Sequence, residues 1–200
     1  MRKQPAVFLD RDGVINADSY EYVKSWDEFR FRTDTLKSLR QLHEAAIEAY
    51  VITNQSGVGR GYFSERILLG ILTRMRMGIA AAGGLIHGIE YCPHGPDEGC
   101  WCRKPQPGSL FTAAAKYGLD LRRSVFVGDS CGDINAGHAA GCTTIFLTTR
   151  SELPPHQGFP EGVAQVTDHL SRCIVPPDYV AESLSQAVDI ILALPGFAQR

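Results

Sequence analysis

Short apolar runs alternate with segments in which apolar residues recur every three or four positions. The runs predict strands, and the helical spacing predicts amphipathic helices between them. The predicted strands lie at 6–9, 50–52, 86–91, 125–128 and 144–147, and the predicted helices at 36–47, 67–79, 110–117 and 134–140. Regular alternation from residue 6 to about 150 predicts an α/β fold with a doubly wound parallel sheet.

Boundary residues support these helices. Caps are expected at the starts from Thr33-Asp34 and Ser64, with Pro107 opening a third helix, and helix ends are expected at Gly83-Gly84, Gly118 and Gly141. Residues 17–31 are predicted to form a loop that covers the segment before them. Beyond residue 150, we expect an exposed excursion at 151–171, to which no chemistry is assigned. A short edge strand at 173–175 and a closing amphipathic helix at 184–192 follow.

The composition is that of an ordinary globular protein and changes the picture only by exclusion. The chain has 200 residues, 44% of them hydrophobic, and a formal net charge of -2. One domain spanning 1–200 is expected. Lysines and arginines are scattered, so a nucleic-acid partner is not expected. No apolar window approaches the roughly 20 residues of a membrane span, and no secretion signal is visible. We therefore expect a cytoplasmic monomer that acts on a small molecule.

Acidic residues stand where predicted strands end. Asp10 and Asp12 follow the first strand, with Gly13 permitting a tight turn, and Asp129 follows the strand at 125–128. In a doubly wound sheet, ligands bind beyond the carboxyl ends of the strands, so these carboxylates are expected to share one crevice. Carboxylates in such a place suit Mg2+, which takes one or two of them together with a phosphate oxygen.

Donors for an anion follow the second strand and the cysteine-rich loop. Thr53, Asn54, Gln55 and Ser56 open a run of hydroxyl, amide and glycine residues suited to an anion. Lys104 can balance charge around a phosphoryl group. Three acids with one cation and one lysine indicate phosphoryl-transfer electrostatics.

The cysteines fall into two groups. Cys92, His94, Cys100 and Cys102 can place four ligands around one ion, and a closed Cys3His set is typical of structural zinc. The other cysteines are scattered and are interpreted as small buried residues, with disulfides not expected in a reducing compartment.

Four motifs in order resemble the haloacid dehalogenase superfamily of phosphatases. They are Asp10-Arg11-Asp12-Gly13, Thr53-Asn54-Gln55, Lys104-Pro105, and Gly128-Asp129 followed by Asp133. The resemblance implies that Asp10 is the nucleophile that forms an aspartyl-phosphate, and that Asp12 is the general acid and base.

The same resemblance implies the ligands of the phosphoryl group and the metal. Asp10, the main-chain carbonyl of Asp12, and Asp129 would hold Mg2+. Thr53 and Lys104 would bind the phosphoryl oxygens. Asp133 would support the site without being a direct ligand.

Within the superfamily, the zinc loop directly before Arg103-Lys104-Pro105 resembles the heptose-bisphosphate 7-phosphatases. This resemblance implies hydrolysis of the 7-phosphate of D-glycero-D-manno-heptose 1,7-bisphosphate, in the biosynthesis of nucleotide-activated heptose. Arg103 would recognise the second phosphate. Asp18 and Tyr22 would contact the sugar. Asn54, Gln55 and Ser56 would also bind the substrate. The resemblance also implies the absence of a large cap domain, with the zinc loop walling the site.

One position departs from that family, and three alternative functions remain open. Family members commonly carry a basic residue after the metal-binding aspartate, whereas this chain has Ser130, so one phosphate contact is missing or supplied from elsewhere. The nearest alternative is a histidinol-phosphate phosphatase, which shares the acids and the zinc loop. Polynucleotide end-repair phosphatases share the Thr-Asn-Gln motif, but they need a track of basic residues to hold nucleic acid, and the basic residues of this chain are scattered. The third alternative is a phosphoryl-accepting regulatory domain. Asp12 argues against it, because a second acid placed to activate water favours turnover over storage of the phosphoryl group.

Overall fold

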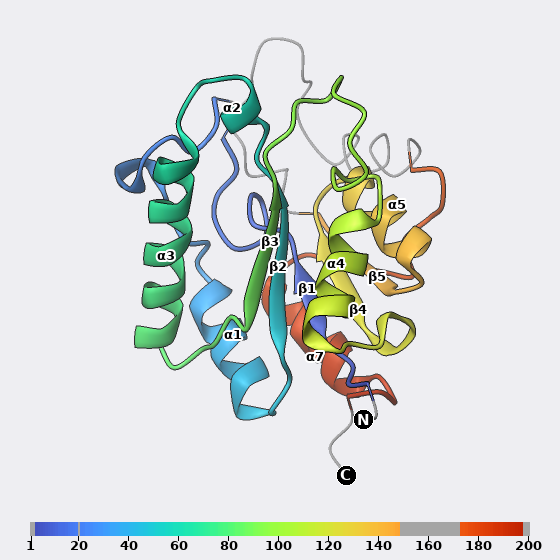
Figure 1. The fold of residues 1–200 in the computed structure, drawn as a ribbon. Helices are drawn as coiled ribbons and strands as arrows, with labels where there is room; N and C mark the ends of the chain where they lie inside the picture. Colours follow the sequence, from blue (N-terminus) through green and yellow to red (C-terminus); the bar gives the residue numbers. More distant parts are fainter. Residues whose placement is uncertain (1–2, 20, 149–172, 198–200) are drawn as a thin grey trace.

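A six-stranded parallel sheet forms the centre of the computed structural model, which describes residues 3–19, 21–148 and 173–197 (Figure 1). The strand order is β3-β2-β1-β4-β5-β6, and every neighbouring pair is parallel. The strands are β1 (Val7–Leu9), β2 (Ala49–Asn54), β3 (Gly88–Cys92), β4 (Val125–Gly128), β5 (Thr143–Leu147) and β6 (Tyr179–Ala181). The predicted doubly wound parallel sheet is confirmed.

Helices cover both faces of this sheet. They are α1 (Thr35–Glu44), α2 (Ser56–Gly59), α3 (Glu65–Ala81), α4 (Gly108–Tyr117), α5 (Cys131–Ala140) and α7 (Leu184–Ala193), with 3-10 turns η1 (Trp26–Glu28) and η2 (Leu121–Arg123). One apolar core packs α1, α3 and α7 against one face, and a second packs α4 and α5 against the other. Successive residues of β1 alternate between them: Val7 and Leu9 enter the first core and Phe8 the second.

The predicted helix boundaries hold at most positions. Ser64 caps α3 by accepting a backbone hydrogen bond, and Gly118 and Gly141 end α4 and α5 in the left-handed conformation. Asp34 is the N-cap residue of α1, as predicted, but its side chain makes no capping hydrogen bond within the helix. Instead, Asp34 Oδ2 accepts from the backbone N–H of Ser185 at 2.8 Å, which ties the start of α1 to α7.

Two expectations about irregular segments need revision. The edge strand is at 179–181 and not at 173–175, since Pro176 and Pro177 interrupt the chain after the predicted run and cannot donate to a sheet. The anion-binding run predicted after β2 contains the single turn α2. The loop at 17–31 contains η1, whose Trp26 stacks on Phe29 at 4.9 Å. The excursion predicted at 151–171 lies outside the described residues.

The scattered cysteines do not all behave as predicted. Cys142 is buried, and burial raises the pKa of its thiol to about 12, in keeping with a small core residue. Cys131 and Cys173 are only half-buried and form a disulfide, so the expectation of no disulfide is wrong. A reducing medium opposes disulfides in general, whichever cysteines the fold brings together. The fold brings the first residue of α5 beside the segment that precedes β6, and the two Cα atoms lie 4.9 Å apart.

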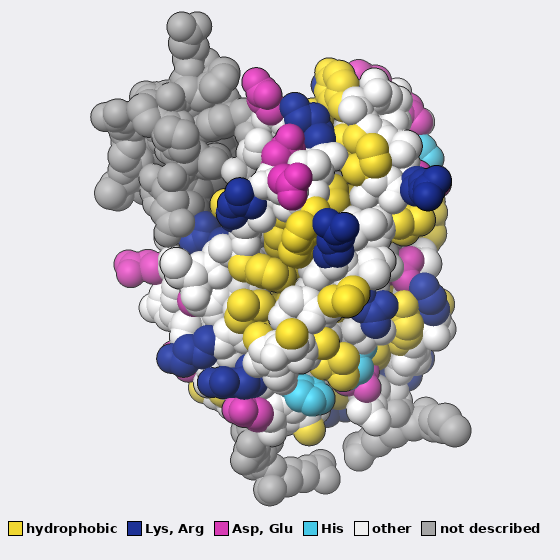
Figure 2. Space-filling model, turned by 90° about the vertical axis from the view of Figure 1, so that its left-hand side faces the viewer, with side chains coloured by type: hydrophobic (Ala, Val, Ile, Leu, Met, Phe, Trp, Pro, Cys, Tyr) yellow, Lys and Arg dark blue, Asp and Glu magenta, His cyan; other side chains and the backbone are white. Residues whose placement is uncertain are grey.

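The outer side of α3 is mixed in character. Figure 2 shows this side of the molecule, where apolar side chains lie between separate basic ones. Ile67, Leu69 and Met77 are exposed on α3, as are Arg66 and Arg74. No continuous basic track runs along this described face. Among the described residues, none of the helices combines the length and apolarity that crossing a bilayer requires.

Candidate active site

Carboxylates from two neighbouring strands meet at the carboxyl edge of the sheet. Asp10 follows β1 and Asp129 follows β4, which pair in parallel. Asp133, in the first turn of α5, completes the group, and one oxygen from each of the three lies within 4.8 Å of the others. All three residues are buried or nearly so. Buried carboxylates repel one another strongly unless cations balance them, so this cluster fits a divalent metal.

Gly13 is required for this arrangement. Its φ is +81°, in the left-handed region, and a Cβ atom there would overlap the Asp129 carboxylate. Glycine both permits the turn after β1 and lets the Asp12 loop approach the neighbouring strand end.

Lys104 supplies the positive charge at the centre of the cluster. Its Nζ lies 2.8 Å from Asp10 Oδ1 and 2.5 Å from Asp133 Oδ1, and it donates to the carbonyl of Ile52 at 2.9 Å. Burial alone would lower the pKa of Lys104, but Asp10 and Asp133 raise it above its ordinary value, so the lysine is charged. Burial raises the pKa of Asp10 to about 7, although the Lys104 ammonium opposes this shift.

Asp12 is held by four N–H donors. Its Oδ1 accepts from Arg11 Nε at 3.1 Å, Arg11 Nη2 at 2.7 Å and Asn16 Nδ2 at 2.9 Å. Its Oδ2 accepts from Gln55 Nε2 at 2.9 Å. Burial would raise the pKa of Asp12, but the Arg11 guanidinium and these hydrogen bonds hold it below its ordinary value. Arg11 and Asn16 were given no role from the sequence; a charged residue between two acids at a buried strand end was the available signal.

The predicted anion-binding run after β2 makes contacts within the protein. Thr53 is buried, and its hydroxyl accepts from Gln55 Nε2 at 2.9 Å. The Asn54 side chain donates to the Lys104 carbonyl and accepts from the Lys104 N–H, both at 3.1 Å. The side-chain amides of Asn54 and Gln55 are therefore engaged by the protein, and their direct contact with substrate stays a prediction. Ser56 lies 3.3 Å from the Tyr22 hydroxyl.

The departure at Ser130 has a structural role. Ser130 is the N-cap of α5, and its side chain and that of Asp133 form a reciprocal capping box. The Ser130 hydroxyl donates to Asp133 Oδ2 at 2.6 Å, leaving Asp133 Oδ1 for Lys104. The serine thus orients the carboxylate that helps to hold Lys104.

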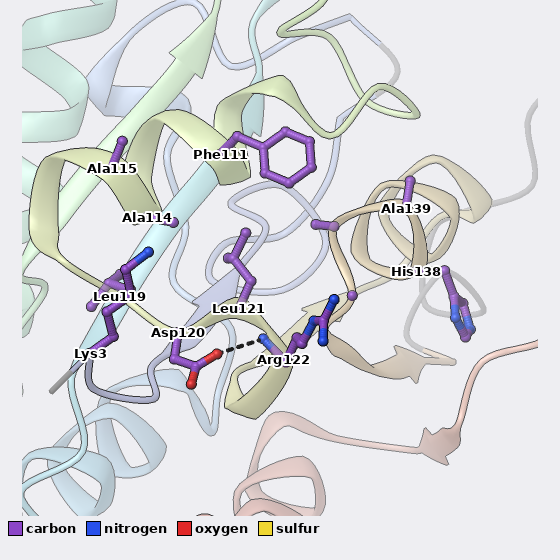
Figure 3. Close-up of a pocket in the computed structure, with 12 residues that line it drawn as sticks. Lys3, Phe111, Ala114, Ala115, Leu119, Asp120, Leu121, Arg122, His138 and Ala139 are labelled. Carbon is purple, nitrogen blue, oxygen red and sulfur yellow. Dashed lines mark hydrogen bonds between the residues drawn. The ribbon is translucent and has the colours of Figure 1, made fainter.

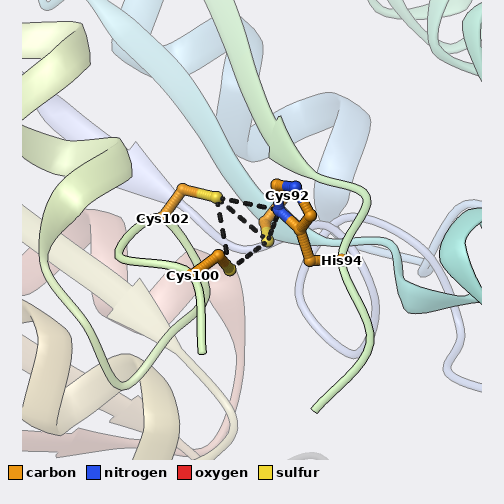
Figure 4. A group of neighbouring side chains, drawn as sticks. All are labelled: Cys92, His94, Cys100 and Cys102. Atoms are coloured by element: carbon orange, nitrogen blue, oxygen red, sulfur yellow. Dashed lines mark hydrogen bonds between the residues drawn. The ribbon is translucent and has the colours of Figure 1, made fainter. Parts of the chain in front are cut away.

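The four predicted zinc ligands come together beside this centre (Figure 4). The sulfurs of Cys92, Cys100 and Cys102 lie 3.2 to 3.5 Å apart, and His94 Nδ1 lies 3.4 and 3.3 Å from the sulfurs of Cys92 and Cys102. A tetrahedral zinc site, with Zn–S near 2.3 Å, places sulfurs about 3.8 Å apart. The donor set and its spacing therefore fit a structural metal ion.

Backbone hydrogen bonds join the Cys3His loop to the anion-binding run. Gln55 N–H donates to the Cys92 carbonyl at 2.7 Å, and Gly59 N–H donates to the Pro93 carbonyl at 2.9 Å. Arg103 follows the loop, and its Nη1 donates to the His94 carbonyl at 3.3 Å. Arg103 and Lys104 also line a cavity of about 590 Å3 with residues of the loop.

A second cavity, of about 480 Å3, lies at Tyr22. It is lined by Glu21, Tyr22, Lys24, Arg60 and Tyr62. Tyr22 has a φ of 67°, which bulky residues rarely adopt, and its ring packs on Tyr62 at 5.3 Å. Lys24 lies 3.5 Å from Glu21, whereas no ion pair or side-chain hydrogen bond joins Arg60 to another described residue. Arg60, Lys24 and Tyr62 were not predicted from the sequence.

The predicted sugar contact Asp18 has a local partner. Its Oδ1 accepts from the Ser19 N–H at 2.8 Å, so the carboxylate closes a turn in the covering loop. Its contact with substrate stays a prediction.

Another cavity lies away from the carboxylates, between α4 and α5 (Figure 3). It has a volume of about 600 Å3 and includes Phe111, Leu121, Arg122 and His138 in its lining. Among the described residues, the two clusters able to hold a metal lie elsewhere. The carboxylate centre, and not this cavity, therefore has the groups for chemistry.

Two family models and several named relatives match the sequence of this chain. A sequence model of the haloacid dehalogenase-like hydrolases matches residues 4–141, and a second hydrolase-like model matches residues 101–187. The D-glycero-beta-D-manno-heptose-1,7-bisphosphate 7-phosphatase of Pseudomonas aeruginosa is 44% identical over 143 residues, covering 72% of this chain and 80% of the relative. The D-glycero-alpha-D-manno-heptose-1,7-bisphosphate 7-phosphatase of Photorhabdus laumondii is 37% identical over 152 residues, covering 72% of this chain and 82% of the relative.

A solved structure gives the same picture. The D,D-heptose 1,7-bisphosphate phosphatase of B. bronchiseptica, solved with magnesium and phosphate, superposes with a TM-score of 0.82 at 35% identity. The superposition covers 94% of this chain and 98% of that one.

Proposed function

Because this chain belongs to the haloacid dehalogenase-like hydrolase family, we propose that it removes the 7-phosphate of D-glycero-D-manno-heptose 1,7-bisphosphate. The observation that carries this proposal is the Lys104 ammonium, 2.8 Å from Asp10 in a buried carboxylate centre beside a Cys3His loop. Relatives that share the sequence over most of their length carry that activity in their names. The biological setting would be nucleotide-activated heptose synthesis.

In the proposed reaction, an Asp10 oxygen attacks phosphorus, and the bond from phosphorus to the sugar oxygen breaks. Asp12, acting in its protonated form, gives its proton to that oxygen, so the sugar leaves as an alcohol. Water then attacks the phosphorus of the aspartyl-phosphate and passes a proton to Asp12, which releases phosphate and restores Asp10. Lys104 and the Thr53 hydroxyl bind the phosphoryl oxygens throughout.

The carboxylate cluster fits magnesium by its chemistry and its burial. Asp10, Asp129 and the main-chain carbonyl of Asp12 would hold the ion, which supplies positive charge against the phosphoryl oxygens. Asp133 would orient Lys104 and remain outside the ligand set. The Cys3His set would hold zinc, which keeps the loop ordered and takes no part in the chemistry.

The sugar and its second phosphate would lie over the covering loop. Tyr22 joins that loop to Ser56 and walls the cavity that contains Arg60 and Lys24. Planar guanidinium groups suit a phosphate because they can donate two parallel hydrogen bonds. Arg60, whose side chain has no ion pair or hydrogen bond with another described residue, and Arg103 are therefore the two candidates for the 1-phosphate.

Phosphate release by purified protein with Mg2+ tests the function. The panel is the two anomers of the heptose bisphosphate, the heptose 7-phosphate and histidinol phosphate, with Asp10→Asn as the inactive control. Faster release from the bisphosphate than from the other esters is expected. Faster turnover of histidinol phosphate would overturn the substrate proposal. The anomer that is preferred comes from the same panel.

We further propose that residues 1–200 form one domain and act as a cytoplasmic monomer. The near-neutral charge and the small substrate support a free enzyme without nucleic-acid partners. Sedimentation velocity and fractionation of cells test the two statements separately.

A further inference from the structure

The Asp12 carboxylate is fixed on both oxygens by buried donors. Arg11 is 1% exposed and Gln55 2%, while the Asp12 side chain is 23% exposed. Three of the donors bind Oδ1 and one binds Oδ2. Asp12 is thus the solvent-reaching member of an otherwise enclosed network. Hydrogen bonds to both of its oxygens fix the plane of its carboxylate.

The Gln55 amide links Asp12 to the phosphoryl-binding residue. Its Nε2 donates to Asp12 Oδ2 and to Thr53 Oγ1, each at 2.9 Å, which uses both N–H bonds of the amide. Because the Thr53 oxygen accepts from Gln55, its own O–H is left to donate to a phosphoryl oxygen. Gln55 is itself placed by its backbone bond to the Cys92 carbonyl. The Gln55 amide therefore positions the Asp12 carboxylate and the Thr53 hydroxyl relative to each other.

Arg11 is a costly residue to keep in a core. It is the largest of the fully buried side chains, and its Nη1 has no hydrogen-bond partner within the described part of the chain. A buried charge is destabilising unless it is fully paired, and an apolar side chain of similar size would fill the same space. Packing does not explain why an arginine occupies this buried position. Its two hydrogen bonds to one oxygen of Asp12 do.

We propose that Arg11 and Gln55 are positioning residues for proton transfer, which hold the Asp12 carboxylate in the orientation that serves the leaving sugar oxygen and then the attacking water. The inference rests on the proposed role of Asp12 as acid and base. It does not depend on which sugar the enzyme accepts.

Two esters with different leaving groups test the proposal. A sugar alkoxide needs a proton to leave, whereas p-nitrophenolate leaves without one. kcat/KM covers only the steps up to departure of the alcohol, so it isolates the acid step from the later attack of water. Gln55→Met and Arg11→Met are expected to lower kcat/KM about 100-fold for the sugar phosphate, in line with general acid catalysis. For p-nitrophenyl phosphate, the loss in Arg11→Met should be severalfold at most. The loss in Gln55→Met should be larger, because Thr53 also loses its donor, but still well below the loss on the sugar phosphate.

Asp12→Asn provides the benchmark for this selective loss. In the double variant Asp12→Asn/Arg11→Met, the sugar-phosphate rate should match that of Asp12→Asn alone, because the Arg11 side chain donates to Asp12 and acts through it. Gln41→Met, on α1, is the matched control for the substitution. If Arg11→Met does not fold, Arg11→Lys replaces it, because lysine keeps the charge with a single donor group. Arg11→Lys is expected to show the same selective loss on the sugar phosphate, but a smaller one.

Equal losses on the two esters, or additive losses in the double variant, would overturn the proposal. The test also separates this inference from the proposed function. If wild type ignores the heptose bisphosphate but hydrolyses another alkyl phosphate, the substrate assignment fails, and the same ratio is measured with that alkyl phosphate.

Discussion

Asn54 and Lys104, fifty residues apart in the chain, share two hydrogen bonds between one side chain and one backbone. The Asn54 amide donates to the Lys104 carbonyl and accepts from the Lys104 N–H, each at 3.1 Å. Lys104, the lysine proposed to bind the phosphoryl group, is thereby attached to the end of β2 as though it belonged to a neighbouring strand. The position of its ammonium depends on an asparagine that need not touch substrate.

Asn54→Ala should therefore damage catalysis through Lys104. Two backbone groups lose their partners, which costs about 1 to 3 kcal/mol per buried group left unsatisfied. We expect kcat to fall at least tenfold and the thermal midpoint to drop. Steady-state kinetics and calorimetry measure the two effects. Asn135→Ala, on α5, is the control, and unchanged kcat in Asn54→Ala would contradict the role given to this pair.

The metal-free protein should lose stability as pH rises through neutrality. Burial raises the folded-state pKa of Asp10 from 3.8 to about 7, so between these values the folded state binds more protons than the unfolded state. Stability then falls with rising pH, by on the order of 2 to 3 kcal/mol between pH 5 and 8. The depressed pKa of Asp12 acts in the opposite sense, but only at more acidic pH.

Urea unfolding at several pH values in a chelator that removes Mg2+ measures this slope. Mg2+ should reduce it, since the ion stabilises ionised Asp10. Asp10→Asn should flatten the same interval, and a slope that survives in this variant would assign the effect to another group.

Arg60→Gln should separate the two phosphates of the substrate. Loss of a charge-assisted hydrogen bond costs about 1.5 to 3 kcal/mol, or 10- to 150-fold in affinity. We expect KM to rise by this factor for the bisphosphate and to stay constant for the heptose 7-phosphate. Arg103→Gln, measured in parallel, shows which arginine holds the 1-phosphate. Arg66→Gln, on the exposed side of α3, controls for the loss of a surface charge.

Zinc removal should weaken catalysis without touching a reacting group. Cys92 and Pro93 carbonyls accept from Gln55 and Gly59, so a disordered loop would release the run that follows β2. One zinc per chain is expected by elemental analysis, and Cys102→Ser should lose both the metal and most of kcat. Cys142→Ser should retain the zinc. Full activity in metal-free Cys102→Ser would exclude this coupling.

The strand ends could be predicted because the sequence states them directly. Apolar runs that stop at Asp10 and at Asp129 require acids at the edge of a parallel sheet, and the Cys3His spacing defines its own geometry. These features depend on local pattern and on one rule of topology, and the structure places them as expected.

Features that depend on side-chain direction or on distant pairing could not be predicted. Arg11 could have faced solvent, and only the fold shows that it turns inward onto Asp12. From the sequence, Asn54 was predicted to bind substrate. Its contact with Lys104 depends on the tertiary structure, which no local pattern shows. The partner of Cys131 lies 42 residues away, beyond the reach of any local pattern.

The disulfide between Cys131 and Cys173 makes the redox history of a sample an experimental variable. Reductants protect the thiols of the Cys3His set from oxidation, yet the same reagents exchange with disulfides. Conditions that preserve the metal ligands can therefore open a covalent ring whose anchor lies two residues after Asp129. Kinetic comparisons between variants are meaningful only when thiol content has been titrated in each preparation.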